Sequence, residues 1–217
     1  MFAAYLWRMN DSKLHQTSST AVEARPEDQD TPAPGHIRRL WTGEAAALRD
    51  HLLRLDPESR RSRFGSPVNR HFIEQYAARA LSNDSVVHGF FADGELRGVG
   101  ELRTFGTTIP FEAEAAFSLE RAWQGRGIGN ELLERTILSA RNRGIRSIQL
   151  NCLAENRRMQ AIAKKHEAHL RLRADEVVGE VVNPGATPLS VAREWMAESY
   201  GIATAILDVQ RRAFNSV

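Results

Sequence analysis

A glycine-rich turn between an expected strand and an expected helix restricts the fold of this chain more than any other feature. The turn covers residues 123–130, WQGRGIGN. Before it, residues 111–119 alternate in the manner of a strand. After it, residues 127–141 carry apolar side chains at helical spacing (Ile128, Leu132, Leu133 and Ile137), and Gly144 is placed to end the helix. A strand, a turn and a helix in this order indicate α/β structure.

The chemistry of this turn is that of an anion site. Glycines leave the main chain open to close approach by a ligand. The unpaired N–H groups at the start of a helix, together with the helix dipole, favour a phosphate or diphosphate. No Lys-Ser or Lys-Thr follows the glycines as a P-loop requires, and their spacing is not that of a dinucleotide fold. The residues alone leave a plain glycine-rich connector open as the alternative.

Other periodic segments lie on both sides of this unit. Asp93-Gly94 between two apolar runs predicts a β-hairpin. Thr42 is expected to cap a helix that buries Ala46, Leu48, Leu52 and Leu53. The further strands expected are 36–40, 86–92, 96–102, 147–152, 169–173 and 177–182, and the further helices begin at Asp56 or cover 68–81, 155–165 and 188–213. This alternation predicts a single α/β domain.

Length and composition support one folded unit with two appendages. The chain has 217 residues, of which 42% are hydrophobic, enough for one sizeable core. Residues 11–35 are rich in Ser, Thr, Asp, Glu and Pro, so we expect 1–35 to be a disordered or loosely attached leader. The domain is then 36–183, and 184–217 form a C-terminal helical extension.

Charge and cysteine content exclude several classes of function. The formal net charge is +2, with Arg interleaved among Asp and Glu, so we expect no nucleic acid partner. Cys152 is the single cysteine, which fits a reducing compartment and allows no intrachain disulfide. The apolar residues 2–7 are too few to span a membrane and do not resemble a signal peptide. We therefore expect a cytoplasmic protein without a membrane partner.

Residues 124–129 resemble the acetyl-CoA diphosphate motif of the GCN5-related N-acetyltransferase (GNAT) superfamily, Gln124-x-x-Gly127-x-Gly129. The resemblance extends over residues 36–183. Downstream, 156–159 with 162–165 are similar to the family's second cofactor segment. Upstream, 55–60 with 63–64 resemble a segment of the bacterial protein-lysine acetyltransferase branch. The implied fold is a central mixed, mostly antiparallel sheet flanked by helices, with an added C-terminal helix.

The resemblance implies acetyl-CoA as co-substrate and no metal. Main-chain groups of 117–119 would pair with the pantetheine arm and hold the thioester oxygen as charge develops on it. The glycine-rich turn would hold the diphosphate, while Arg126 either adds a charged contact or points into solvent. The residues expected to contact acetyl-CoA are Phe117, Ser118, Leu119, Gln124, Gly125, Arg126, Gly127, Ile128, Gly129, Asn130 and Asn156.

A general base is expected because an alkyl ammonium, with a pKa of about 10.4, must lose a proton before it attacks. Along 111–119, Glu112, Glu114, Ala116 and Ser118 share one face of the strand. Carboxylates on a central strand need a partner or a function. Glu114 matches the glutamate of the lysine-acetyltransferase branch and is the first candidate for the catalytic base. A structural salt bridge is its alternative role, solvation near the strand end is the alternative for Glu112, and Glu101 is a weaker candidate.

One position departs from the family pattern. Many members carry a tyrosine seven residues after the asparagine, where it protonates the leaving thiolate, but this chain has Ala163. The implied activity is acetyl transfer to a primary amine, on a protein lysine or a small molecule. Ala163 keeps a non-enzymatic acyl-CoA sensor or interaction module as the alternative. Trp195 and Tyr200 on the final helix are expected to dock onto the core or onto a second subunit, as in a homodimer.

Overall fold

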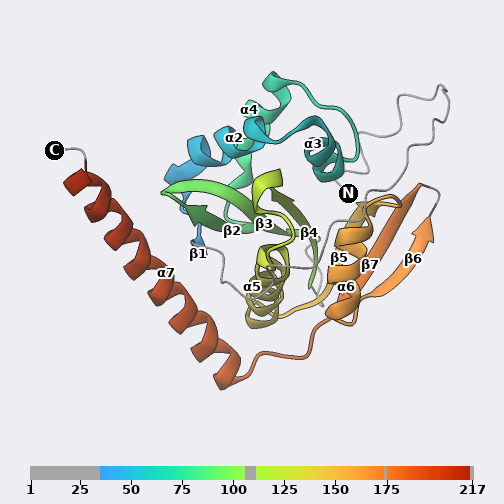
Figure 1. The fold of residues 1–217 in the computed structure, drawn as a ribbon. Helices are drawn as coiled ribbons and strands as arrows, with labels where there is room; N and C mark the ends of the chain where they lie inside the picture. Colours follow the sequence, from blue (N-terminus) through green and yellow to red (C-terminus); the bar gives the residue numbers. More distant parts are fainter. Residues whose placement is uncertain (1–34, 106–110, 174, 216–217) are drawn as a thin grey trace.

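The computed structural model describes residues 35–105, 111–173 and 175–215, and within them the chain forms a seven-stranded mixed sheet (Figure 1). The order is β1-β2-β3-β4-β5-β7-β6, and every neighbouring pair is antiparallel except β4 and β5. The strands are β1 His36–Arg39, β2 Ser85–Ala92, β3 Glu95–Phe105, β4 Phe111–Leu119, β5 Ile145–Leu153, β6 His169–Arg173 and β7 Glu176–Val182. This confirms the expected mixed, mostly antiparallel sheet.

Helices cover both faces of the sheet (Figure 1). They are α2 Ala45–Arg54, α3 Pro57–Phe64, α4 Arg70–Ala80, α5 Ile128–Asn142, α6 Arg157–Lys165 and α7 Pro188–Asn215. The first three enclose one apolar core with β2 and β3, whereas α5 and α6 enclose a second core with β4 and β5. In the described residues, no helix is long and apolar enough to cross a membrane.

Local sequence signals explain most element boundaries. Asp93 (φ 51°) and Gly94 (φ 71°) are both left-handed, which gives the expected hairpin turn between β2 and β3. The Asp56 side chain caps α3 by accepting a hydrogen bond from the Ser59 N–H at 2.9 Å. Gly144 follows α5 with φ 73°, as expected of the residue that ends it.

The start of α2 corrects the sequence prediction. Thr42 is not its cap, because residues Thr42–Glu44 form a 3₁₀ turn ahead of the helix. The carboxylate of Glu44 accepts the N–H of Trp41 at 2.9 Å and also pairs with Arg38 at 2.6 Å. In α2, Ala46 is exposed, and His51 is buried together with Leu48 and Leu52.

For the last helix, the first of the two expected alternatives, docking onto the core, is wrong. Trp195 and Tyr200 do not dock onto the core; their exposed fractions are 71% and 67%. Val191, Ile202 and Ile206 are exposed as well. The predicted leader lies outside the described residues, except for residue 35.

Candidate active site

The parallel strands β4 and β5 separate at the end that leads into the glycine-rich turn. Their pairing covers five residue pairs and ends at Ala115 and Leu150. Beyond this point β4 continues to Leu119 paired with β3, and β5 continues to Leu153 paired with β7. Within the described ranges residues 116–119 have no strand partner on the β5 side. Main chain there is available to a ligand between the strands.

The glycine-rich turn presents a run of main-chain N–H groups. Gly125 (φ 78°) and Gly127 (φ 81°) are left-handed, and a Cβ added to either would meet no described atom within 4 Å. The N–H groups of Asn130 and Glu131 already donate to the Gly127 carbonyl. Those of residues 125–129 have no hydrogen-bond acceptor among the described residues. Five free donors at the start of a fifteen-residue helix form an arrangement suited to binding an anion.

Gly129, the third glycine of the motif, serves helix packing. A Cβ at Gly129 would lie 3.1 Å from the Cδ1 atom of Ile162, so a larger residue would push α6 away from α5. The side chain of the next residue, Asn130, accepts a hydrogen bond from His166 at 3.1 Å. That of Asn156 caps α6 by accepting the Met159 N–H at 3.1 Å. Both asparagines therefore fix α6 beside the turn.

The Gln124 side chain braces the turn from three sides. Its Nε2 group donates to the Leu119 carbonyl at 2.9 Å and to the Ser59 hydroxyl at 3.1 Å, and its Oε1 atom accepts from Arg158. These bonds join β4, α3 and α6 around the turn. Arg126, by contrast, is exposed, with its guanidinium 5.2 Å from the ring centre of Trp123.

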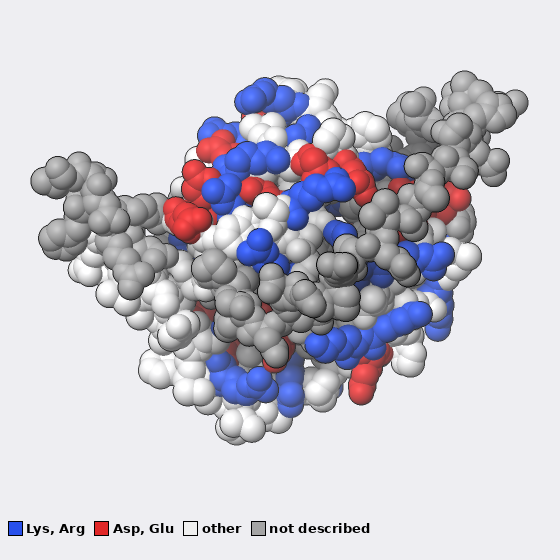
Figure 2. All heavy atoms as spheres, viewed as in Figure 1, with Lys and Arg blue, Asp and Glu red and all other residues white. Residues whose placement is uncertain are grey.

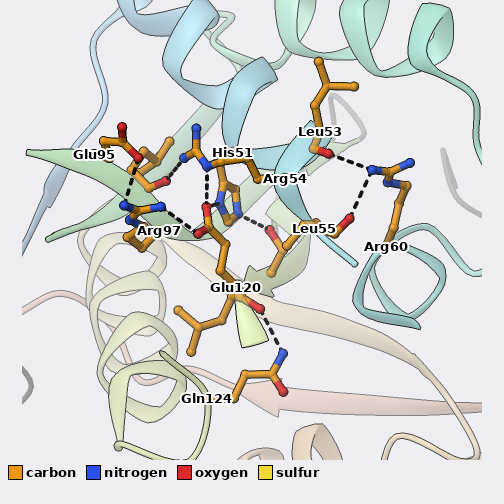
Figure 3. Close-up of polar contacts among 12 residues, drawn as sticks. His51, Leu53, Arg54, Leu55, Arg60, Glu95, Arg97, Glu120 and Gln124 are labelled. Carbon is orange, nitrogen blue, oxygen red and sulfur yellow. Dashed lines mark hydrogen bonds and ion pairs between the residues drawn. The ribbon is translucent and has the colours of Figure 1, made fainter. Parts of the chain in front are cut away.

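A buried Ser118–His51–Glu120 chain holds the end of β4 (Figure 3). His51 is fully buried, with Nε2 2.9 Å from the Ser118 hydroxyl and Nδ1 3.3 Å from the Glu120 carboxylate. Burial lowers the pKa of His51, so the ring is neutral. Because a carboxylate only accepts, Nδ1 carries the proton and Nε2 accepts from Ser118. The Ser118 side chain is therefore bound to His51, not free.

Glu120 is the charged residue of the Ser118–His51–Glu120 hydrogen-bond network (Figure 3). Its carboxylate also accepts hydrogen bonds from Arg54 at 2.9 Å and Arg97 at 3.0 Å. Burial alone would raise the pKa of Glu120, but the hydrogen bonds from His51 and Arg54 outweigh it and keep the pKa below its ordinary value. No local sequence pattern indicates this network, because His51 and Glu120 are 69 residues apart.

The three candidate acids lie in different surroundings. Glu112 is exposed. Glu101 is buried and pairs with Arg63 at 2.9 Å, and it also accepts a hydrogen bond from the Tyr76 hydroxyl. Glu114 is half-buried and accepts a hydrogen bond from Asn151 at 3.0 Å. Glu114 thus combines partial access with a position one residue before β4 and β5 separate, whereas Glu101 is fixed in an ion pair.

A match to a known family model identifies the family of this chain. Residues 48–167, more than half of the chain, match the model of the acetyltransferase (GNAT) family. The chain belongs to the GNAT family. It is accordingly an acyltransferase, and the glycine-rich turn, β4 and α5 all lie within the matched residues.

Solved GNAT structures share this fold. The GNAT domain of PAT from S. lividans has a TM-score of 0.60 at 24% identity, covering 68% of this chain and 90% of that one. An acetyltransferase of the GNAT family from Streptococcus pneumoniae has a TM-score of 0.56 at 18% identity, covering 69% and 99%. The PaiA N-acetyltransferase from Thermoplasma acidophilum, in complex with coenzyme A, has a TM-score of 0.51 at 19% identity, covering 68% and 98%.

Two remaining positions bear on GNAT chemistry. Ala163 is 2% exposed and packs in the core shared by α5 and α6, so this position offers no acid. Cys152 is buried, and burial with the nearby Glu176 raises the pKa of its thiol to about 11. Cys152 is therefore a packed side chain rather than a nucleophile.

Two cavities of about 310 and 330 Å³ lie away from the turn, beside β1.

Proposed function

We propose that this enzyme transfers an acetyl group from acetyl-CoA to a primary amine in the space between β4 and β5. The observation that carries the proposal is the run of free N–H groups at residues 125–129, placed where these strands separate. A diphosphate needs several donors converging on its oxygens, and a thioester arm needs an unpaired strand edge. The free N–H groups and the unpaired strand edge both lie within residues 116–129.

The residues present fit the co-substrate. Gly125 and Gly127 leave open space above the main chain, which a bulky diphosphate requires. Residues 116–119 would hold the pantetheine arm along the free edge of β4, and a main-chain N–H there would stabilise the developing oxyanion. Acetyl-CoA supplies the activated acyl group. Gln124, Asn130 and Asn156 would act by positioning the turn and α6, since their side chains bind other parts of the protein.

Glu114 is the proposed general base. Its carboxylate lies on the face of β4 covered by α3, one residue before the strand loses its β5 partner. It would take the proton of the acceptor ammonium directly or through a water molecule. The leaving thiolate needs no protein acid, because a thiol with an ordinary pKa of about 8.5 leaves readily, and Ala163 supplies none.

A protein lysine is the acceptor that we would test first. The segment that resembles the lysine-acetyltransferase branch forms α3, which packs on β4 and β5 beside Glu114. Its Ser59 hydroxyl bonds to Gln124 of the turn, and Arg61 reaches Glu155 after β5 at 2.7 Å. A side chain inserted between α3 and β4 would therefore approach the acyl group. A free small-molecule amine is the alternative acceptor.

The test compares lysine peptides, N-terminal peptides and small amines by the release of free coenzyme A. Glu114→Gln is expected to lower kcat/KM at least about 100-fold, the usual contribution of a general base. Glu112→Gln is the matched control, with the same charge change on the same strand face at an exposed position. Equal activity of both variants would refute the assignment of the base.

Calorimetry separates enzyme from sensor. We expect one molecule of coenzyme A to bind per chain, in wild type and in both variants. Binding without turnover on any amine would indicate an acyl-CoA sensor. No binding would refute the proposed site altogether.

A further inference from the structure

Helix α7 is attached to the domain along one narrow face (Figure 1). Ser190 and Gly201 are buried there, and a Cβ on Gly201 would lie 2.7 Å from the Cβ of Arg38 on β1. Glu194 binds α5 by accepting hydrogen bonds from Ser139 at 2.6 Å and from Arg143 at 2.7 Å. The helix is therefore held firmly in place, and the rest of its circumference faces outward.

The outward surface of α7 is apolar. Its exposed large side chains are Leu189, Val191, Trp195, Met196, Tyr200, Ile202, Ile206 and Leu207. In Figure 2 the described atoms along the lower left flank, where the middle of α7 lies, are mostly white, that is, neither Lys or Arg nor Asp or Glu. A helix that is apolar around most of its circumference is normally buried, and soluble monomers rarely expose a patch of more than a few hundred Å².

The size of this surface fits one side of a dimer. From their exposed fractions, these eight side chains present on the order of 900 Å², against about 800 Å² per partner in a standard interface. At roughly 25 cal/mol per Å², covering such an area gives a large driving force even after the entropy of association is lost. A partner that covers the whole flank is therefore required, rather than a small ligand.

The exposed side chains form two rows. At about 100° per residue, one row falls within a 40° arc of the helix and the other within a 60° arc. The first row is Leu189, Met196, Tyr200 and Leu207, and the second is Val191, Trp195, Ile202 and Ile206. Between them runs a line of small residues, Ala192, Ser199 and Ala203, where another helix can approach closely.

The two rows are each symmetric, about centres that lie half a residue apart. Leu189 and Leu207 lie nine residues on either side of Glu198, and Met196 and Tyr200 lie two residues on either side. The second row is symmetric about the peptide between Glu198 and Ser199. A two-fold axis perpendicular to a pair of antiparallel helices places each row of one helix against the same row of the other, with residue order reversed.

We propose that α7 is the interface of a homodimer, in which it packs antiparallel against α7 of a second copy with the two-fold axis at Glu198 and Ser199. Leu189 of one copy then contacts Leu207 of the other, and Trp195 contacts Ile202. A lipid surface is disfavoured because the apolar part of α7, residues 189–207, contains a single cation, Arg193, which pairs with Glu134 at 3.3 Å; the other two arginines of the helix, Arg211 and Arg212, lie beyond it. Helices that bind membrane surfaces carry several exposed cations.

Light scattering after size exclusion tests the association on the full chain, whose monomer mass is 24.3 kDa. We expect twice that mass, and Trp195→Glu should weaken dimerisation at least about 30-fold, as for an interface hot spot. Leu172→Glu is the matched control, since Leu172 on β6 is 73% exposed against 71% for Trp195. A monomer at about 100 μM, or equal masses for the two variants, would overturn the proposal.

Single cysteines test the register. In the proposed pair the two copies of residue 199 lie about 2 Å apart along the helix axis, whereas those of residue 192 lie about 19 Å apart. Ser199→Cys should therefore form an intermolecular disulfide on mild oxidation, and Ala192→Cys, on the same outer line, should not. Cross-linking of both, or of Ala192→Cys alone, would exclude this pairing. Capture of a monomer by phosphatidylglycerol vesicles would show a lipid partner instead.

Discussion

Replacement of Glu101 by glutamine separates a structural carboxylate from a catalytic one. Glu101 and Arg63 form a 2.9 Å ion pair in which their side chains are 4% and 7% exposed. Burial raises the pKa of Tyr76, so its phenol remains protonated and donates to the same carboxylate. Breaking a buried pair on one side costs about 3–5 kcal/mol, because the remaining charge is left uncompensated. The Glu114 carboxylate also interacts electrostatically with Arg63 and would still compensate part of its charge in the variant. We therefore expect a loss at the lower end of this range, about 3 kcal/mol.

The assay is urea unfolding of Glu101→Gln with Glu155→Gln as the control. Glu155 pairs with Arg61 at 2.7 Å, but the side chains are 63% and 52% exposed, so the same change of charge should cost less than about 1 kcal/mol. For a domain of this size, 3 kcal/mol corresponds to about 6–12 °C in Tm. Equal unfolding free energies for the two variants would refute the reasoning that burial makes the Glu101 pair structural.

Three other predictions concern the pH dependence, the turn and the thiol. Burial would raise the pKa of Glu194, but hydrogen bonds from Ser139 and others lower it, so its stabilisation is complete above about pH 5 and is lost as the pH falls through its folded-state pKa. The unfolding free energies of wild type and Glu194→Gln should therefore differ at pH 7 and converge as the pH falls below the lowered folded-state pKa of Glu194; a constant difference would contradict this. Gly127→Ala should cost about 1–2 kcal/mol in urea unfolding because its φ is 81°, whereas Gly43→Ala, also in open space but without a left-handed φ, should cost little. The Cys152 thiol should react with a disulfide reagent far more slowly in the native protein than in urea, and similar rates would show that it is accessible.

Most of the fold was predictable because its signals are local. The alternation along Phe111–Leu119 and the helical spacing that follows gave β4 and α5 within one residue of their bounds. Asp93-Gly94 gave the hairpin from the turn chemistry alone. These segments depend on periodicity and on left-handed glycines, both of which can be read from neighbouring residues.

Contacts between distant segments were not predictable. His51 is a polar residue on an apolar helix face, and only the folded chain shows that Ser118 and Glu120 satisfy both of its nitrogens. Residue 124 was expected to contact acetyl-CoA as part of the turn, but the bonds of its side chain to Leu119, Ser59 and Arg158 carry no local sequence signal. The apolar pattern of α7 predicted packing onto the core or a second subunit, whereas its large apolar side chains are exposed in the described chain. Periodicity alone does not tell which surface, if any in the same chain, covers such a helix.

The shortness of the β4–β5 pairing has a consequence for the exchange of amide hydrogens with deuterated solvent. Five residue pairs join the two halves of the sheet there, against eight between β2 and β3 and seven between β5 and β7. Transient opening at this junction breaks few main-chain bonds, so β5–β7 should take up deuterium as a unit and sooner than β2–β4. A molecule bound across the junction would bridge the halves and slow that uptake, which would make the sheet itself report the arrival of the co-substrate.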